Sequence, residues 1–292
     1  MQCLSTLIHQ NKKTMIELKS MNFAYSKKKK IFDDLTLTIE EGHIYGLLGK
    51  NGAGKTTLLK LMTGLLFPQS GLTTAFGIDT KKRHVNMLEE IYFLPEEIWL
   101  PDVNVAGYLK MYANSYPRFS HELFQRCLKE FEIDPIDKFK RMSLGQRKKV
   151  AISFALATQC KILIMDEPTN GLDIPSKGQF RKLSAELIGD DRCIILSTHQ
   201  VRDLESLIDT VIILDDSHIL MNNTIDQICK RIVFKTLGSL DNQPDVIYSE
   251  FTPKGYLAVT PNMDGSDSKV DLEILFNMTT QNANLMKQMF NH

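Results

Sequence analysis

The sequence predicts an α/β fold with a parallel sheet that is covered by helices on both faces. Apolar runs of strand length at 161–166, 193–198 and 210–214 each follow a helical stretch. They are almost continuously apolar, as expected of strands buried on both faces. Shorter alternating strands at 15–40 indicate a small antiparallel β layer. Apolar residues at helical spacing predict a helical subdomain, inserted at about 98–158.

Composition restricts the class of protein. The 292 residues can form one large domain, or one domain with a small appendage. Apolar residues make up 43% and charged residues 24%, which is ordinary for a globular protein with a buried core. The formal net charge is zero, so no nucleic-acid partner is expected.

Cysteine usage and hydropathy indicate the compartment. The five cysteines are scattered and never form a CxxC pair, which argues against a disulfide framework or a zinc ribbon. Cys160 and Cys193 flank apolar runs, so we expect them to be small buried hydrophobic residues. No apolar stretch is long enough for a membrane span, and residues 1–14 lack the pattern of a secretory signal. We expect a cytoplasmic protein whose first fourteen residues are a disordered leader, or precede a true start at Met15.

The C-terminal part, 228–292, has a different sequence pattern from the preceding residues and is expected to be a small α+β extension. It contains turn-rich stretches, a strand at 256–259 and a terminal helix near 285–290. From Thr236 onward it carries seven Asp or Glu residues against three Lys. The extension is either a structural cap on the preceding domain or an element that stabilises or regulates a dimer.

A glycine-rich segment between a strand and a helix predicts a nucleotide site. Residues 49–56 match the phosphate-binding loop GxxxxGK[ST] and follow the apolar run 44–48. Glycines allow successive N–H groups to point at phosphates, and the following helix adds its positive N-terminal end. Lys55 is expected to reach the β- and γ-phosphates, and the Thr56 hydroxyl to bind Mg²⁺. The nucleotide-binding residues expected here are Gly49, Lys50, Asn51, Gly52, Ala53, Gly54, Lys55, Thr56 and Thr57.

Two adjacent carboxylates follow the strand at 161–166. Asp166 at the end of a buried strand is a candidate for the Mg²⁺ side of the site. Glu167 beside it is a candidate general base for an attacking water. Such a pair can also be a solvated strand end, so its meaning depends on the other motifs.

The order of the motifs resembles that of ATP-binding cassette (ABC) ATPases over about 15–227. Ser143-Leu-Gly145-Gln146 resembles their signature motif, and 166–173 resembles their Walker B motif and D-loop. The sequence 196–199 resembles their H-loop. The resemblance implies a P-loop NTPase core, and an adenine-stacking role for the aromatic residue upstream of the loop, Tyr25.

The resemblance also implies how these residues act. Two chains would sandwich two ATP molecules head to tail, with each site shared between the subunits. Ser143 and Gly145 form a helix N-terminus suited to an anion, and in the family this N-terminus grips the γ-phosphate held by the other subunit. His199 would contact the γ-phosphate. The residues implied from the signature and D-loop are Ser143, Gly145, Gln146 and Asp173, and the catalytic set is Lys55, Ser143, Glu167 and His199.

Two positions depart from the family pattern. Glu96 stands where the Q-loop usually has Gln; it can still coordinate Mg²⁺ or the lytic water, but as an anion. Leu144 replaces the first glycine of the signature, while Ser143 and Gly145 remain. We therefore expect both sites of a homodimer to hydrolyse ATP.

The resemblance implies the ATPase subunit of an ABC transporter, with ATP and Mg²⁺ as cofactors. The permease would be a separate multi-span polypeptide, and this chain would lie at the cytoplasmic face of the membrane through it. The tail resembles stand-alone ATPases of bacterial export systems. The alternative is a soluble ABC ATPase of a cytosolic assembly machine. Trp99 is expected either in the core or at the groove that receives a permease helix. Residues 27–30 are expected either to form a solvated turn or to contact phosphate or lipid headgroups.

Overall fold

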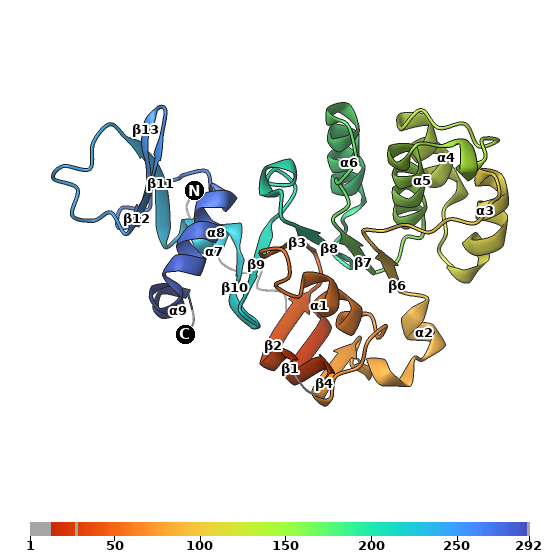
Figure 1. Ribbon diagram of the computed structural model, residues 1–292, viewed down its shortest axis with the longest axis horizontal. Helices are drawn as coiled ribbons and strands as arrows, with labels where there is room; N and C mark the ends of the chain where they lie inside the picture. Colours follow the sequence, from red (N-terminus) through yellow and green to blue (C-terminus); the bar gives the residue numbers. More distant parts are fainter. Residues whose placement is uncertain (1–12, 27–28, 291–292) are drawn as a thin grey trace, which may run out of the picture.

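The computed structural model describes residues 13–26 and 29–290 and places a six-stranded sheet between two smaller units (Figure 1). Helices α3 to α5 lie at one end, and a three-stranded sheet lies at the other. Within these residues, no helix is long and apolar enough to cross a membrane. Of the leader expected at 1–14, residues 1–12 lie outside the described residues, and Thr14 already belongs to the first strand. Lys27 and Lys28 of the expected turn also lie outside them.

The central sheet confirms the parallel α/β prediction. Its strand order is β10-β9-β3-β8-β7-β6, and all neighbours pair in parallel except the antiparallel pair β9–β10. The carboxyl ends of β3, β7 and β8 therefore meet at one edge of the sheet. The strands are β3 His43–Leu48, β6 Ile91–Leu94, β7 Ile162–Asp166, β8 Cys193–Thr198, β9 Thr210–Asp215 and β10 His218–Thr224.

Alternating side chains of these strands supply two separate cores. In β7, Leu163 packs in one core and Ile164 in the other, and in β8 the pair Ile194 and Ile195 divides in the same way. Successive side chains of a strand point to opposite faces, so a strand covered on both faces must be apolar throughout. Cys193 in β8 is fully buried, as expected from the sequence.

The expected antiparallel layer forms a second sheet of order β2-β1-β4-β5. Leu58 and Leu59 of helix α1 pack in the same core as residues of this layer and of β3. The helix that follows the glycine-rich loop is therefore held between two sheets. These elements are β1 Thr14–Ser26, β2 Lys29–Glu40, α1 Lys55–Met62, β4 Ser70–Ala75 and β5 Ile78–Asp79.

The inserted helical part packs around Phe154. Its ring lies 5.0–6.3 Å, between ring centroids, from those of Tyr92, Tyr108, Phe119 and Phe124, and its side chain is 1% exposed. This aromatic cluster joins α3, α4 and α5 to β6, so it fixes where α5 begins. The helices here are α2 Val85–Leu88, α3 Val105–Tyr112, α4 His121–Glu130, α5 Leu144–Ala157 and α6 Ile174–Leu187.

The C-terminal extension has the expected α+β composition. The strand expected at 256–259 lies within β13, and the helix expected at 285–290 lies within α9. Met278 of α8 and Met286 of α9 share one core with Val211 and Met221 of the central sheet. The elements are α7 Ile225–Cys229, β11 Ile232–Leu237, β12 Tyr248–Thr252, β13 Gly255–Pro261, α8 Leu272–Gln281 and α9 Ala283–Phe290, so the boundary expected after residue 227 falls inside α7.

Candidate functional site

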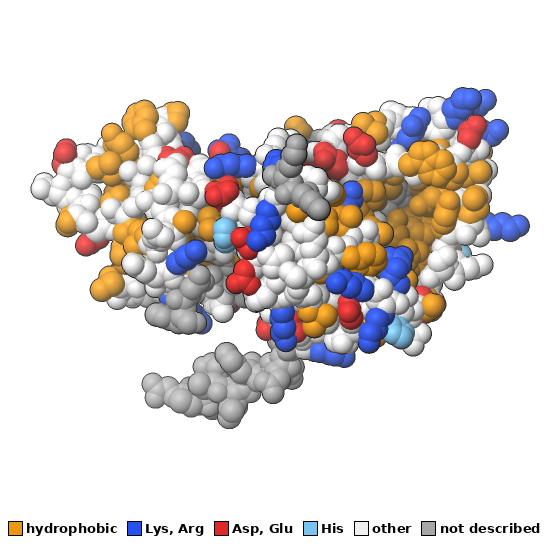
Figure 2. Space-filling model, turned by 60° about the horizontal axis from the view of Figure 1, so that its bottom comes forward, with side chains coloured by type: hydrophobic (Ala, Val, Ile, Leu, Met, Phe, Trp, Pro, Cys, Tyr) orange, Lys and Arg blue, Asp and Glu red, His pale blue; other side chains and the backbone are white. Residues whose placement is uncertain are grey.

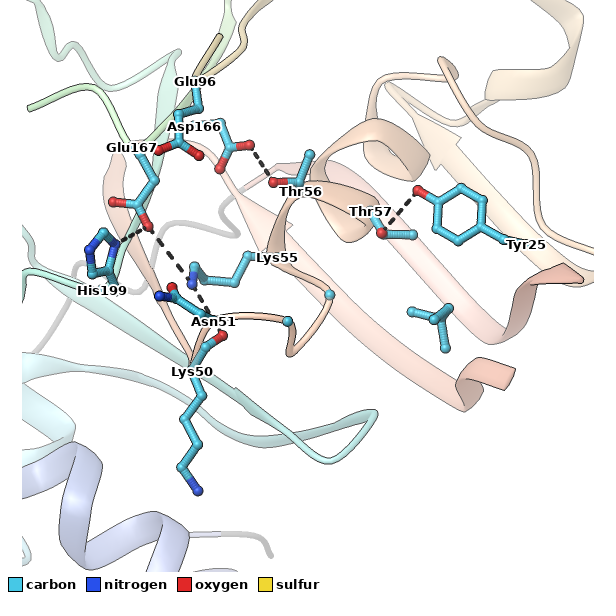
Figure 3. A pocket seen from close by; sticks show the side chains of 13 residues that line it. Tyr25, Lys50, Asn51, Lys55, Thr56, Thr57, Glu96, Asp166, Glu167 and His199 are labelled. Carbon is cyan, nitrogen blue, oxygen red and sulfur yellow. Dashed lines mark hydrogen bonds and ion pairs between the residues drawn. The ribbon is translucent and has the colours of Figure 1, made fainter. Parts of the chain in front are cut away.

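A cleft of about 460 Å³ opens where the carboxyl ends of β3, β7 and β8 meet (Figure 3). This is the edge at which open α/β sheets hold their ligands. Residues from the glycine-rich loop, the Asp-Glu pair and the expected H-loop converge on it. The lining residues are Tyr25, Ile31, Lys50, Asn51, Gly52, Gly54, Lys55, Thr56, Thr57, Glu96, Asp166, Glu167 and His199.

Glycines give the loop between β3 and α1 its shape. Gly52 and Gly54 have φ values of 82° and 103°, a left-handed region that disfavours other residues. A Cβ on Gly49 would lie 2.7 Å from the carbonyl oxygen of Leu214, so only glycine fits at this position of the loop. Gly49 and Ala53, also expected to bind nucleotide, are not among the residues that line the cleft.

Lys55 is buried at the base of the loop. Its ammonium donates to the carbonyl oxygen of Gly49 at 2.8 Å and lies 3.8 Å from Oε1 of Glu167. Burial lowers the pKa of Lys55, and the carboxylates of Glu167 and Asp166 raise it. The Lys55 ammonium is held by oxygen atoms of carbonyls and carboxylates. The oxygens of a polyanionic ligand can replace these partners, so the site is suited to such a ligand.

Thr56 and Asp166 form the candidate metal site. The Thr56 hydroxyl donates to Oδ2 of Asp166 at 2.5 Å, and the hydroxyl of Ser197 donates to Oδ1. Among the described residues, no group of three or more His, Cys, Asp or Glu side chains could hold a metal ion alone. Mg²⁺ in nucleotide sites instead takes one or two protein oxygens together with phosphate oxygens. The hard oxygens of Thr56 and Asp166 fit this ion.

Glu167 is 4% exposed and lies in the left-handed backbone region, with φ at 46°. Its N–H donates to the carbonyl oxygen of Ser197 at 3.2 Å and to the Ser197 hydroxyl at 3.0 Å. Oε2 of Glu167 is buried and finds no hydrogen-bond partner within the described part of the chain. A buried carboxylate oxygen with a free lone pair is suited to accept a hydrogen bond from water.

His199 contacts the other oxygen of this carboxylate. Its Nδ1 lies 2.7 Å from Oε1 of Glu167, and about a third of its side chain is exposed to the cleft. This contact holds the carboxyl of Glu167 between His199 and Lys55 (Figure 3).

Tyr25 lies at the opposite side of the cleft (Figure 3). Its hydroxyl lies 3.1 Å from the Thr57 hydroxyl, and its ring packs edge-on against Phe23 at 5.0 Å. The side chain is 62% exposed, so one face of the ring is available to a planar base. Ile31, which the sequence did not indicate, lines the same part of the cleft with an apolar side chain.

Glu96 lines the cleft near the metal side, but its carboxylate also reaches the D-loop. Oε1 of Glu96 accepts a hydrogen bond from the side-chain amide of Asn170 at 3.0 Å. The sequence did not single out Asn170. The contact joins the loop after β6 to the segment after β7.

The remaining expected residues form a second group outside the cleft. Ser143 is the N-cap of α5; its hydroxyl accepts from the N–H of Gln146 at 3.2 Å, and Gln146 Oε1 accepts from the N–H of Ser143 at 2.9 Å. A Cβ on Gly145 would lie 3.0 Å from the carbonyl oxygen of Gly171. Lys149 of α5 lies 3.6 Å from the carboxylate of Asp173. The structure therefore brings Ser143, Gly145, Gln146 and Asp173 together, but not beside Lys55.

Ser197 is the functional residue that sequence reasoning missed most clearly. It contacts both carboxylate residues of the site, although the resemblance directed attention to His199. The signal is the register of the sheet: β7 and β8 are parallel neighbours, and Asp166 pairs with Ser197.

Comparisons with known proteins agree with this geometry. Residues 32–170 match the family model described as ABC transporter. The chain is 31% identical to the ABC transporter ATP-binding protein NatA of Bacillus subtilis (strain 168), over 73% of this chain and 91% of that protein. It is 30% identical to the methionine import ATP-binding protein MetN of Carboxydothermus hydrogenoformans, over 73% and 67%. A solved ATP-binding subunit of an ABC transporter superposes with a TM-score of 0.67 at 26% identity, over 74% of this chain and 92% of that one.

Proposed function

The chain belongs to the ATP-binding subunits of ABC transporters, ATPases that hydrolyse ATP to power transport, and from this premise we propose that it drives a separate membrane permease through an ATP-dependent dimer of itself. The observation that carries the ATP-hydrolysis step of the proposal is the arrangement around the carboxylate of Glu167. One of its oxygens is bound by His199 near Lys55, and the other is buried and free to orient a water molecule.

Four residues of the cleft have direct roles in the proposed reaction. Glu167 accepts a proton from water that attacks the γ-phosphate, or orients that water. Lys55 stabilises the negative charge that develops on the phosphate oxygens. His199 orients the Glu167 carboxylate and contacts the γ-phosphate. Tyr25 stacks on the adenine, and its hydroxyl remains near Thr57.

Mg²⁺ would be held by Thr56 and Asp166, with Glu96 at the edge of the same site. When bound, the ion neutralises charge on the phosphate oxygens. Ser197 keeps Asp166 oriented through its hydroxyl. Glu96, held by Asn170, supplies an anion where the family usually has a neutral amide.

The second group, at the N-terminus of α5, completes the site of a partner copy. Ser143 and Gly145 mark the start of a fourteen-residue helix, whose positive end favours a phosphate. These residues lie outside their own chain's cleft. In a head-to-tail dimer they would contact the nucleotide that is bound in the partner's cleft. Leu144 and Ile174 are 68% and 85% exposed beside Ser143 and Asp173, and such a dimer would cover them.

The permease is proposed to dock near Trp99. The Trp99 side chain is 81% exposed, so the expectation that it packs in the core is wrong: the loop after β6 carries it outward. A cleft of about 290 Å³ beside it has a mixed lining, in which Asp102, Lys140 and Arg147 accompany the apolar Leu100, Pro101 and Phe139. Figure 2 shows hydrophobic side chains gathered over the end of the molecule that carries α3 to α5. An apolar surface of this kind is suited to a partner helix.

Export is the proposed direction, on the resemblance of the acidic tail to stand-alone ATPases of export systems. The proposed location is the cytoplasmic face of the membrane, through the permease. The relative named for methionine import shows that membership of the family does not decide direction.

Measuring hydrolysis and association together tests this function. The purified chain should hydrolyse ATP with Mg²⁺. The Glu167→Gln variant should elute as a dimer with ATP and as a monomer with ADP. Lys55→Ala is the matched control and should remain monomeric with either nucleotide. A chain that does not hydrolyse ATP, or a Glu167→Gln variant that stays monomeric with ATP, would contradict the proposal.

A further inference from the structure

Lys148 is a buried cation that the mechanism above does not use. It lies on α5, one turn beyond the Ser143 end, and is 3% exposed. Its ammonium donates to the carbonyl oxygen of Glu167 at 2.9 Å and to the carbonyl oxygen of Glu96 at 3.2 Å. A buried ammonium is costly unless it is paired and hydrogen-bonded, so these two carbonyls fix its position.

The first of these carbonyls belongs to a strained residue. Glu167 has a φ of 46°, a backbone conformation that is strained for a non-glycine residue and persists where its surroundings hold it. Ser197 holds the N–H of Glu167. On the other side, the carbonyl oxygen accepts from Lys148 at 2.9 Å and from the N–H of Asn170 at 3.3 Å. Lys148 provides the shorter of these two contacts.

The second carbonyl connects the same ammonium to the Q-loop. Glu96 is bound through its backbone by Lys148 and through its carboxylate by Asn170. Burial lowers the pKa of Lys148, and the carboxylates of Glu96, Asp166 and Glu167 oppose this shift. One cation therefore lies among three carboxylate residues, at the point where α5, the loop after β6 and the end of β7 meet.

We propose that Lys148 is a positioning residue for ATP hydrolysis: it holds the backbone of Glu167 so that the carboxylate faces the attacking water, and it ties this geometry to the Q-loop. The inference rests on the proposed function and deepens it. Because Lys148 and Ser143 lie on one helix, movement of the helix end that grips the partner's nucleotide reaches Glu167 of the same chain. Lys148 itself does not line the cleft, and it acts through the carbonyl oxygens that it binds.

The test compares Lys148→Met in two backgrounds of the full chain. Methionine keeps the length and apolar stem of lysine but removes the donor and the charge. Hydrolysis is measured under single-turnover conditions with Mg²⁺ and radiolabelled ATP, and affinity is measured with a fluorescent ATP analogue. Lys182→Met is the matched control, because Lys182 lies on α6, is 57% exposed in its side chain and contacts Glu130 on the surface.

The expected result is a split between turnover and binding. Lys148→Met should lower the hydrolysis rate by about tenfold or more, because a displaced general base loses part of the roughly 10²–10⁴-fold that it contributes, while ATP affinity changes by less than about twofold. In the Glu167→Gln background the same substitution should change the residual rate by less than about twofold, since it acts through Glu167. Lys182→Met should change neither quantity.

Other outcomes overturn the inference. They are a Lys148→Met rate within about twofold of wild type, or an equal loss of rate in both backgrounds, which general damage to the fold would cause. Lys148→Gln is measured in parallel and decides the matter if the Met variant no longer binds ATP. A wild-type chain that does not hydrolyse ATP contradicts the proposed function itself, so the two failures are distinguishable.

Discussion

At the end of β7, adjacent residues Asp166 and Glu167 have different contacts. Asp166 accepts hydrogen bonds from two hydroxyls, those of Thr56 and Ser197, as a metal-side carboxylate should. Glu167 turns through a left-handed backbone and presents its carboxylate to His199 and Lys55. Two carboxylates with different surroundings can take different roles in one reaction.

Glu167→Gln should reduce the ATP hydrolysis rate by about 100-fold or more, because a positioned general base contributes about 10²–10⁴. The amide keeps the size of the side chain, so ATP affinity should stay within about twofold. Single-turnover hydrolysis and equilibrium binding of labelled ATP check this. A rate within about threefold of wild type would remove Glu167 from the reaction.

Tyr25→Ala should weaken ATP binding by about 2–10-fold, since an aromatic contact contributes about 0.5–1.5 kcal/mol. Tyr25→Phe is the matched control. It keeps the ring, loses the contact with Thr57, and should bind ATP within about twofold of wild type. Binding of a triphosphate that lacks a base should be equal in all three proteins. Equal ATP affinity for the Ala variant would show that the ring does not contact adenine.

Among the elements, helix α5 has two roles, one at its N-terminus and one in the packing of the helical part. Its N-terminus presents Ser143 outward, and its C-terminal part is buried in the aromatic cluster around Phe154. The cluster sets the position of the helix, and so sets where Ser143 and Lys148 lie. Packing in the helical part is therefore coupled to the position of Ser143 at the partner's nucleotide and, through Lys148, to the position of Glu167.

Phe154→Ala should destabilise the fold by about 3–5 kcal/mol, the usual cost of removing a buried phenyl ring. Thermal unfolding followed by circular dichroism should show a clearly lower midpoint. Ile136→Ala is the control, since Ile136 is 73% exposed, and it should unfold within about 2 °C of wild type. An unchanged midpoint for Phe154→Ala would show that the cluster is not what holds α5.

The ordered motifs predicted the elements of the cleft because each is local in the sequence. Residues 49–57 are contiguous, and 166–167 follow a strand that can be recognised by its apolar run. Lys148 and Asn170 could not be found in this way, because their contacts join segments that lie far apart in the chain. The left-handed backbone of Glu167 was also hidden, since ordinary propensities disfavour it for a non-glycine residue. The exposure of Trp99 depends on the path of a loop, which periodicity does not describe.

For the whole molecule, the extension and the ATPase core share one hydrophobic core. Met278 and Met286 pack with residues of the central sheet, and Arg202 after the H-loop pairs with Glu273 of α8 at 2.7 Å. The apolar contact outweighs the ion pair, because an exposed ion pair contributes little. This arrangement favours the structural-cap role over a regulatory one.

A chain that ends at Arg231 should therefore lose stability, because removal of α8 and α9 uncovers Leu220 and Met221 of β10, which are 8% and 1% exposed. The unfolding midpoint should fall by about 5 °C or more. Arg202→Ala is the control and should change the midpoint by less than about 2 °C. A truncated chain that unfolds at the wild-type temperature, with wild-type dimerisation and turnover, would show that the extension is an independent unit.

ATP hydrolysis at this cleft is proposed to drive a membrane permease. The most direct test is affinity purification of Glu167→Gln with ATP and Mg²⁺ from detergent-solubilised native membranes, followed by mass spectrometry. This variant should bind ATP and stall before hydrolysis, so its complexes should persist. We expect recovery of a multi-span membrane protein, with lower recovery when Trp99→Ala is added. Recovery of cytosolic proteins without a multi-span partner would contradict it and favour a cytosolic assembly machine.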